Sequence, residues 1–371
     1  MRVLHAIRTP WAPYSLMFAN DGTRLAVGGG AWYGEGGISL ARLDSGEVAV
    51  TPMGPQRGYG PPSVAGVYFS ADDRYLVAVT RGSSLGPGPT ILFAVDGLSI
   101  GRAAAFEPAG QRRMGDPCAT GAMMAGESTI VRHWASSVEQ CIAVRRFSPR
   151  FACRADDRRH HLTHSRVVVR RGRALTGGGG SLALAEWRAD SGLRESGRAA
   201  EGLISAPLAG EGPCETIPIE GCPRVTAIAA LPGEDGFLTG GLRGELDRWS
   251  WAETLRQERL AVPGAPLANI EPALPTTPKV QEAVAALAWA TYTRDSVVAI
   301  CTLHDETRWV SVDAGGRLRL WQGAQQLGAW TLPAPGTPRS LAAHPSEPWI
   351  AVGIKQGGFG HPSSLVLVLE L

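Results

Sequence analysis

The sequence predicts an all-β fold, a seven-bladed β-propeller in which seven small sheets form a closed ring. Three observations predict it: short apolar strands and tight turns recur along the chain, their spacing leaves room for seven copies, and each end carries part of one sheet. Seven units of roughly 53 residues account for the whole chain, slightly more than the about 40 to 45 typical of such units. We therefore treat residues 1–371 as a single propeller domain.

Each copy of the repeat contains short apolar runs joined by tight turns and a glycine-rich loop. The first copy reads SLMFANDGTRLAVGGG and continues after its loop as ISLARLDSG. Alternating or short continuous apolar runs, with Asp-Gly, Asp-Asp or Gly-Gly at the turns, are typical of strands rather than helices. The recognisable copies begin near residues 15, 64, 165, 225, 284 and 339. The doubled gap after residue 64 predicts a divergent copy near residue 115.

The two ends of the chain predict how the ring closes. A small twisted sheet cannot bury both faces alone, whereas radial stacking buries them and leaves only short edges. The last copy ends in the strand SLVLVLEL, while residues 1–8, MRVLHAIR, form a strand that precedes the first copy. We expect residues 1–8 to pair with this final strand and complete the seventh blade.

The sixth copy is the least certain in its strands. It follows a proline-rich, extended connector at residues 263–278, and we prefer KVQEAVAALAWATY, residues 279–292, as its inner strand. The composition of this segment also suits a helix. In that case the sixth blade draws its inner strand from SVVAICTL, residues 296–303.

Composition limits the class of protein. With 44% hydrophobic and 19% charged residues, the chain can build a core despite 47 Gly and 27 Pro. A net charge of +2 argues against a globally basic nucleic-acid binder. No apolar run approaches the roughly 18 residues of a membrane helix, and the start lacks a secretion signal. We expect a cytoplasmic, bacterial protein without membrane contact, and 34 Arg against two Lys suggest a GC-rich coding bias.

Several residues carry a resemblance to a known family. Trp187, Trp249 and Trp321 each close a third strand, and Asn20-Asp21-Gly22 and Ala71-Asp72-Asp73 form first hairpin turns. In these positions the chain resembles the WD-repeat β-propeller family, with degenerate repeats, since Arg188, Ser250 and Gln322 follow the Trp in place of Asp. The resemblance implies a scaffold for protein partners. The missing Asp predicts that several blades are held mainly by packing, without the buried hydrogen-bond network of standard blades.

One end of such a ring gathers the loops between second and third strands and the loops leading into first strands. Exposed aromatic residues beside Arg are typical of interface hot spots. An alternative is that the aromatic rings pack down as lids and the arginines bond neighbouring loop carbonyls. The candidate partner-binding residues are Trp11, Tyr14, Trp32, Tyr33, Arg57, Tyr59, Arg224, Arg339, Phe359 and His361.

Four of the loops leading into first strands end alike, in Pro13-Tyr14, Pro62-Ser63, Pro223-Arg224 and Pro338-Arg339. Proline lacks the N–H that a strand ladder requires, so we expect it to be the last residue before each inner strand. The next residue is then expected to line the channel mouth. In WD-repeat proteins this position contacts partners, which the resemblance extends to Tyr14, Arg224 and Arg339.

A basic segment at Arg145–Arg173 contains ten Arg against two Asp. Arg forks match carboxylates and phosphates, so the segment suits an acidic protein surface or nucleic acid, and a solvated face is the alternative. Few aromatic residues interleave with it, which disfavours base stacking. The candidate patch consists of Arg145, Arg146, Arg158, Arg159, Arg170 and Arg171.

No motif indicates catalysis, a metal or a cofactor. The chain lacks GxSxG, and TGGGGS at residues 176–181 lacks the Lys and the helix of a phosphate loop. His160, His161 and His164 follow Cys153 without zinc spacing. The sequence therefore predicts a non-catalytic scaffold that binds a protein or peptide. The alternative is a hydrolase or lyase whose site is assembled from several blades at the central channel.

Overall fold

The computed structural model describes most of the chain, and for residues 104–224 it describes the backbone alone. Outside the described residues are 31–35, 55–62, 71, 81–89, 107–117, 125–128, 136–139, 148–152, 157–166, 171–172, 179–201, 208–214, 218–224, 232–235, 242–243, 252–254, 261–294, 306 and 357–363.

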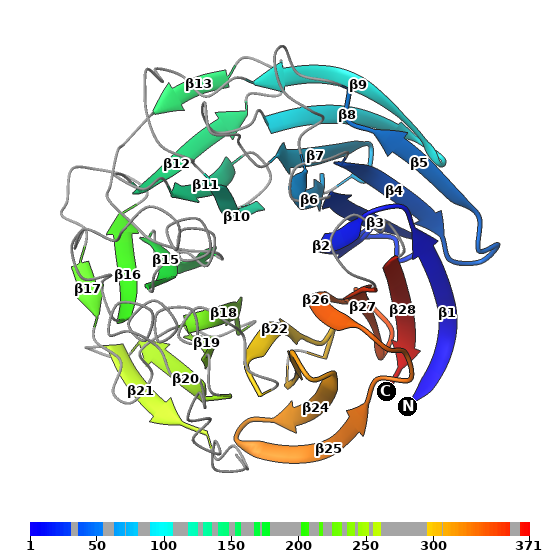
Figure 1. Cartoon of the computed structure of the whole chain (residues 1–371). Helices are drawn as coiled ribbons and strands as arrows, with labels where there is room; N and C mark the ends of the chain where they lie inside the picture. Colours follow the sequence, from blue (N-terminus) through cyan, green and yellow to red (C-terminus); the bar gives the residue numbers. More distant parts are fainter. Residues whose placement is uncertain are drawn as a thin grey trace, which may run out of the picture.

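The strands of the described residues form seven four-stranded antiparallel sheets arranged radially in a ring (Figure 1). In each sheet the first strand lies at the channel and the last at the outer edge. Blade 1 contains β2 (Ala12–Phe18), β3 (Arg24–Gly30), β4 (Gly36–Arg42) and β5 (Val48–Pro52). Blade 2 contains β6 (Val64–Phe69), β7 (Tyr75–Thr80), β8 (Thr90–Asp96) and β9 (Ser99–Phe106). Blade 3 contains β10 (Cys118–Met124), β11 (Thr129–Ala135), β12 (Gln140–Phe147) and β13 (Cys153–Asp156).

The other four blades repeat this order. Blade 4 contains β14 (Val167–Arg170), β15 (Arg173–Gly178), β16 (Gly202–Pro207) and β17 (Glu215–Ile217). Blade 5 contains β18 (Val225–Ala230), β19 (Gly236–Gly241), β20 (Leu246–Trp251) and β21 (Leu255–Arg259). Blade 6 contains β22 (Val297–Thr302), β23 (Arg308–Asp313), β24 (Arg317–Gln322) and β25 (Gln325–Thr331). Blade 7 contains β26 (Thr337–Ala343), β27 (Trp349–Lys355), β28 (Ser364–Glu370) and β1 (Arg2–Thr9).

The ring closes as predicted, because the first strand of the chain is the outer strand of the last blade. β1 pairs antiparallel with β28 from Arg2 opposite Glu370 to Thr9 opposite Ser364. An ion pair of 2.8 Å between Arg2 and Glu370 joins the outermost pair. The two termini therefore lie side by side at the edge of blade 7 (Figure 1).

Each sheet buries both faces against its neighbours, which explains the nearly continuous apolar runs of the middle strands. Every residue of β4 except the last is buried, whereas β5 at the outer edge is largely open to solvent. Apolar side chains from adjacent blades form shared clusters, such as Ile38 and Leu40 of blade 1 with Val67 and Leu76 of blade 2. The core is therefore divided among the interfaces between blades.

Glycines in second strands let adjacent blades approach closely. A Cβ at Gly353 would lie 2.4 Å from Ser340 Oγ and 2.8 Å from Pro13 Cγ of blade 1. A Cβ at Gly240 would likewise lie 2.6 Å from Cγ1 of Val297 in blade 6. A side chain at these positions would push two blades apart.

We expect Gly353→Ala to lower the free energy of unfolding by about 1 to 3 kcal/mol, because the proline ring and the buried serine cannot move aside freely. Gly101→Ala is the matched control, since a Cβ at Gly101 meets nothing within 4 Å. Urea unfolding of both variants measures the difference. Equal stability of the two variants would contradict tight packing between blades 7 and 1.

The inner strands share a local irregularity near their starts. In six of the seven inner strands that the structure describes, the pairing with the second strand skips one residue, which is a β-bulge. The skipped residues are Tyr14, Ala65, Thr120, Thr226, Val298 and Arg339. The prediction that proline immediately precedes the inner strand is wrong for Pro13 and Pro338. Both are paired within their strands, one residue before the bulge.

The preferred assignment of residues 279–292 as the inner strand of blade 6 is wrong. That strand is β22, drawn from SVVAICTL, so the blade begins at Val297 and not near residue 284. Residues 279–292 lie outside the described residues. The first strands of the other blades begin at residues 12, 64, 118, 167, 225 and 337.

Two blades contain a buried hydrogen bond that the degenerate motif did not predict. In blade 5 the indole N–H of Trp249 donates to Thr239 Oγ1 at 3.0 Å, and in blade 6 that of Trp321 donates to Ser311 Oγ at 3.1 Å. Trp321 also stacks on Trp309, with ring centroids 4.9 Å apart. Blades 5 and 6 therefore combine packing with a buried side-chain hydrogen bond, and that several blades are held mainly by packing stays a prediction. Trp187 lies outside the described residues.

Across the described part of the chain, no helix has the length and apolar character needed to cross a membrane.

Candidate interaction face

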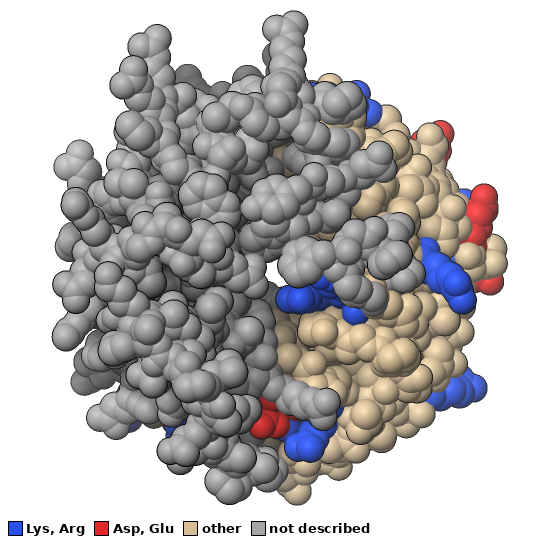
Figure 2. Space-filling view, viewed as in Figure 1, with Lys and Arg blue, Asp and Glu red and all other residues tan. Residues whose placement is uncertain are grey.

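The end of the ring that carries the starts of the inner strands is called the loop face here. It also carries the connections between second and third strands, namely residues 31–35, 81–89 and 357–363 in blades 1, 2 and 7. Figures 1 and 2 look onto this face. Because the strands run antiparallel, the turns between first and second strands lie at the opposite end.

Most of the predicted partner-binding residues belong to connections outside the described residues. These are Trp32, Tyr33, Arg57, Tyr59, Arg224, Phe359 and His361. Trp32 and Tyr33 fall between β3 and β4, and Phe359 and His361 fall between β27 and β28. These are connections between second and third strands, as expected. Their part in binding stays a prediction.

Trp11 corrects the expectation of an exposed ring. Its relative exposure is 9%, and its ring atom Cη2 would lie 2.2 Å from a Cβ at Gly37. The six-membered ring of the indole therefore packs closely against β4 at Gly37, where a larger residue than glycine has no room. Trp11 acts as a lid that orders the loop face, which is the alternative considered for these aromatic residues, and it offers little surface to a partner.

Tyr14 and Arg339 are brought together by the ring. They are the bulge residues of β2 and β26, which are neighbouring inner strands. The hydroxyl of Ser340 donates to the carbonyl of Pro13 at 2.8 Å and ties the two bulges to each other. Both side chains are half-buried. A bulge re-aims the side chain of its extra residue. The side chains of Tyr14 and Arg339 therefore do not follow the alternation between the two sheet faces that the rest of each strand shows.

The basic segment lies in blades 3 and 4, where the backbone alone is described. Arg145 and Arg146 are in β12, opposite Ala155 and Arg154 of the outer strand β13. Arg170 ends β14. Arg158, Arg159 and Arg171 lie outside the described residues, so a contiguous patch stays a prediction.

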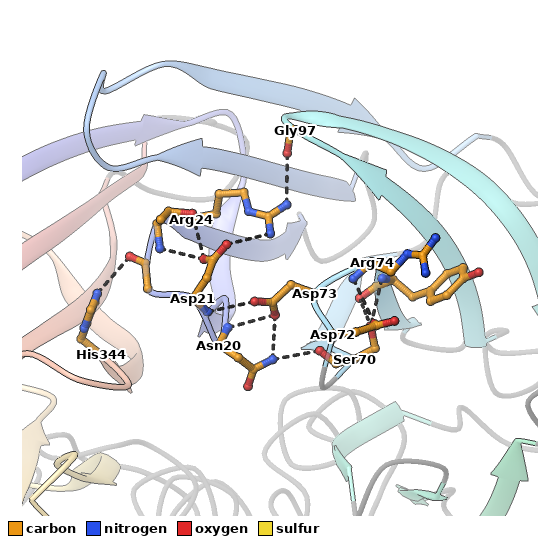
Figure 3. A network of polar contacts seen from close by, with 12 residues as sticks. Asn20, Asp21, Arg24, Ser70, Asp72, Asp73, Arg74, Gly97 and His344 are labelled. Carbon is orange, nitrogen blue, oxygen red and sulfur yellow. Dashed lines mark hydrogen bonds and ion pairs between the residues drawn. The ribbon is translucent and has the colours of Figure 1, made fainter.

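At the opposite end of the ring, one carboxylate joins blade 2 to blade 1 (Figure 3). The Asp73 carboxylate accepts bonds from the backbone N–H groups of Asn20 and Asp21, both at 2.9 Å, and from the Asn20 amide at 2.6 Å. The same amide donates to the carbonyl of Ser70 at 2.8 Å. Asp73 itself is buried and has a φ of 56°, a backbone conformation unusual for a residue other than glycine.

A second contact of this kind links blade 1 to the turn of blade 2 (Figure 3). Arg24 donates to Asp21 at 3.2 Å and to the carbonyl of Gly97 at 3.4 Å. Burial raises the pKa of the Asp21 carboxyl, but hydrogen bonds from Thr23 and the charge of Arg24 outweigh it and leave this pKa below its usual value. The contribution of Asp21 to stability is therefore present above the ordinary pKa of Asp and lost as the pH falls through the lowered value.

His344 joins blade 7 to blade 1 at the same end (Figure 3). Its Nδ1 accepts bonds from the backbone N–H groups of Ser346 and Glu347, at 3.3 and 3.0 Å. The ring proton therefore belongs on Nε2, which donates to the carbonyl of Gly22 at 2.9 Å. Three blades are thus joined in series on the face away from the channel-mouth pair.

Blade 6 contains a buried ion pair near its loop-face end. Arg319 and Asp313 meet at 3.2 Å with side-chain exposures of 3% and 2%, and the Asp313 carboxylate also accepts the N–H of Arg317 at 2.8 Å. Burial raises the pKa of Asp313 and lowers the pKa of Arg319. Among the described residues, Nη1 of Arg319 has no hydrogen-bond partner. The pair is therefore held by mutual attraction against a large loss of hydration.

Sequence reasoning missed the hydrogen bonds of the Asp73 carboxylate and the ion pair between Asp313 and Arg319. The Asp-Asp pair at the blade 2 turn was recognised only as a turn, although a buried carboxylate needs partners. Asp313 and Arg319 stand on adjacent strands around a Gly-Gly turn, a spacing compatible with a cross-strand pair. The sequence contains no sign that either cluster is buried between blades.

Comparison with known proteins identifies the fold. No protein-family model matches the sequence, and no curated protein matches it. Similar solved structures include U3-55K, with a TM-score of 0.62 and 14% identity over 99% of this chain and 98% of that one. A structure of RRP9 WD40 repeats gives 0.61 and 14% over 99% and 96%. The β-propeller domain of Cps50 (Swd1) from Myceliophteria thermophila gives 0.60 and 11% over 99% of each chain.

These structures match almost the whole chain, but their sequence identities of 11 to 14% show only that the fold is similar. The radially arranged four-stranded sheets of the described residues agree with a β-propeller fold. The chain therefore has the fold of the WD40 β-propellers.

Proposed function

We propose that this protein is a non-catalytic scaffold that binds a protein or peptide on its loop face, around the mouth of the channel between blades 7 and 1. The observation that carries the proposal is that two bulges lie on the neighbouring inner strands β2 and β26. They place Tyr14 and Arg339 next to each other at the channel mouth. Tyr and Arg are the residue types most enriched in binding hot spots, because a rigid ring and a planar guanidinium lose little entropy on contact. The WD-repeat resemblance points to the same two positions.

The surroundings of the pair favour recognition over chemistry. The hydrogen bond of Ser340 between the bulges and the close packing of Trp11 on Gly37 order this part of the face, so that little further ordering is needed when a partner docks. The neighbouring connections contain the remaining predicted aromatic residues, including Trp32, Tyr59 and Phe359. Together they would surround the channel mouth with residues of the hot-spot type. A place inside a bacterial cell belongs to the same proposal.

Site-specific photo-crosslinking tests the binding face. A benzophenone amino acid is placed at Tyr14 in one variant and at Arg74, in the exposed turn of blade 2 at the opposite end, in the control. We expect the Tyr14 probe to form a discrete crosslink to one protein in cells, and the purified protein to crosslink again at the same position. Equal crosslinking from both positions, or a partner captured only from Arg74, would overturn the proposal.

A further inference from the structure

Three Asp-Gly pairs occur in the sequence, at residues 21–22, 96–97 and 235–236. Such a pair can react within itself, because the glycine nitrogen and the Asp carboxyl carbon close a five-membered ring when they bond, and no Cβ on the glycine hinders the approach. The other aspartates that the structure describes precede residues with side chains. Asp235 lies outside the described residues, so the fold is compared at Asp21-Gly22 and at Asp96-Gly97.

At Asp21-Gly22 the fold occupies both reacting groups. The Asp21 carboxylate accepts hydrogen bonds from the N–H and the hydroxyl of Thr23, at 2.9 and 2.8 Å, and from Arg24 at 3.2 Å. The N–H of Gly22 donates to a backbone carbonyl of the same turn at 2.9 Å. Gly22 is also buried, and the ring of His344 would lie 2.5 Å from a Cβ there. The nitrogen and the carboxyl carbon of this pair therefore cannot meet unless several contacts break (Figure 3).

At Asp96-Gly97 both reacting groups are open. Asp96 ends β8, Gly97 begins the two-residue turn to β9, and both residues are exposed. Among the residues that the structure describes, neither the Asp96 carboxylate nor the N–H of Gly97 has a hydrogen-bond partner. The carbonyl of Gly97 accepts from Arg24 at 3.4 Å, which leaves its nitrogen unoccupied (Figure 3). A Cβ at Gly97 would meet only Nη2 of Arg42, at 3.5 Å, so the nitrogen is easily approached.

We propose that Asp96 is a site of isoaspartate formation, at which the chain modifies itself independently of the binding face proposed above. The nitrogen of Gly97 attacks Cγ of the Asp96 carboxylic acid, the N–Cγ bond forms, and the carboxyl hydroxyl leaves with the amide proton as water. The product is a cyclic succinimide. Water then adds to the α-carbonyl of Asp96 and breaks its bond to the nitrogen, so that the peptide link runs through Cβ and Cγ and the α-carboxyl is free.

The product changes the turn between β8 and β9. The main chain gains one carbon at Asp96, which displaces the carbonyl of Gly97 from Arg24 and so removes one contact between blades 1 and 2. Arg24 keeps its ion pair with Asp21 on its own blade. The free α-carboxylate stands on an exposed turn, and it is the group that isoaspartyl methyltransferases esterify with S-adenosylmethionine.

Isoaspartate mapping of the full chain after prolonged incubation tests the proposal. Folded protein and protein unfolded in guanidinium chloride are kept at physiological temperature and neutral pH and then digested. Chromatography with mass spectrometry separates each isoaspartyl peptide, and methyl labelling by an isoaspartyl methyltransferase identifies it. In the unfolded chain, Asp21 and Asp96 should react at similar rates because their local chemistry is the same. In the folded chain, Asp96 should react at least about tenfold faster, a difference in activation free energy of about 1.4 kcal/mol.

Thr23→Ala tests the physical cause, because it removes the hydroxyl bond to the Asp21 carboxylate. It should speed isoaspartate formation at Asp21 by up to about fivefold, the effect of one ordinary hydrogen bond. Asp96 in the same protein is the matched control and should react at an unchanged rate. Circular dichroism shows whether the variant is folded, and the comparison of Asp21 with Asp96 in the unsubstituted chain decides the matter if it is not.

Two results would overturn the proposal. The first is equal protection of Asp96 and Asp21 by the fold, measured for each as the ratio of its rates in the unfolded and the folded chain. The second is an absence of isoaspartate at Asp96 in the folded chain after an incubation in which the unfolded chain has formed it.

Discussion

Arg319→Met is expected to lower the free energy of unfolding by about 3 to 5 kcal/mol at neutral pH, because it leaves the carboxylate of Asp313 buried without its counter-charge. Arg319 and Asp313 are both almost completely enclosed, so water cannot replace the lost partner. Desolvation already raises the pKa of Asp313 in the intact pair. Removal of the guanidinium would raise it further, and the carboxyl would take up a proton more readily on folding.

Two controls separate loss of the ion pair from loss of packing. The double variant Arg319→Met with Asp313→Asn should recover at least about half of the loss, because no charge is buried and the Asn carbonyl can still accept from Arg317. The loss in Arg319→Met should also shrink as the pH is lowered from about 7 to 5, since protonation neutralises Asp313 in the folded state. Urea unfolding of the four proteins of the cycle at both pH values measures these effects. Equal losses in the single and double variants would show that Arg319 stabilises blade 6 through packing alone.

The Asp73→Ala substitution is expected to cost about 3 kcal/mol. A charge-assisted hydrogen bond contributes about 1.5 to 3 kcal/mol, and Asp73 accepts three hydrogen bonds from the turn of blade 1, partly open to water. Alanine is also strained at a φ near 56°, which adds about 1 kcal/mol. Asp73→Gly relieves that strain and should therefore be more stable than Asp73→Ala by about this amount.

Asp72→Ala is the matched control, because its carboxylate accepts from Ser70 and Arg74 within its own hairpin. It should cost less than about 1 kcal/mol, as is usual for an exposed turn. Hydrogen exchange of the amides of Asn20 and Asp21 adds a local measurement, since both should exchange faster in Asp73→Ala and remain protected in Asp72→Ala. Unchanged exchange in Asp73→Ala would show that the contact between blades 1 and 2 does not depend on this carboxylate.

The strands were predictable because their pattern is local. Alternating apolar runs and Asp-Gly or Asp-Asp turns gave most of the sheets, and the unpaired segments at the two ends gave the closure of β1 on β28. The sixth blade was less predictable, since residues 279–292 and 296–303 both satisfied the apolar pattern. Only pairing with β23 distinguishes them, and pairing involves residues outside the segment itself.

The candidate site was predicted in composition but not in arrangement. Tyr14, Arg339 and Trp11 all follow from loop positions, yet Trp11 is buried and the other two stand on bulges. Whether an aromatic ring faces a partner or its own backbone depends on the space opposite it, here the missing side chain of Gly37. Neither the bulges nor this space leaves a distinctive signal in a single sequence.

The sequence by itself determined the repeated succession of short strands and turns and the closure of the ring, because local pattern and turn chemistry decide these. The tertiary structure alone decided which side chains meet between blades, such as Asp73 with the turn of blade 1 and His344 with Gly22. Those contacts join residues from different repeats. The ring brings them together only after every sheet has taken its place, and their energies depend on burial that no isolated repeat possesses.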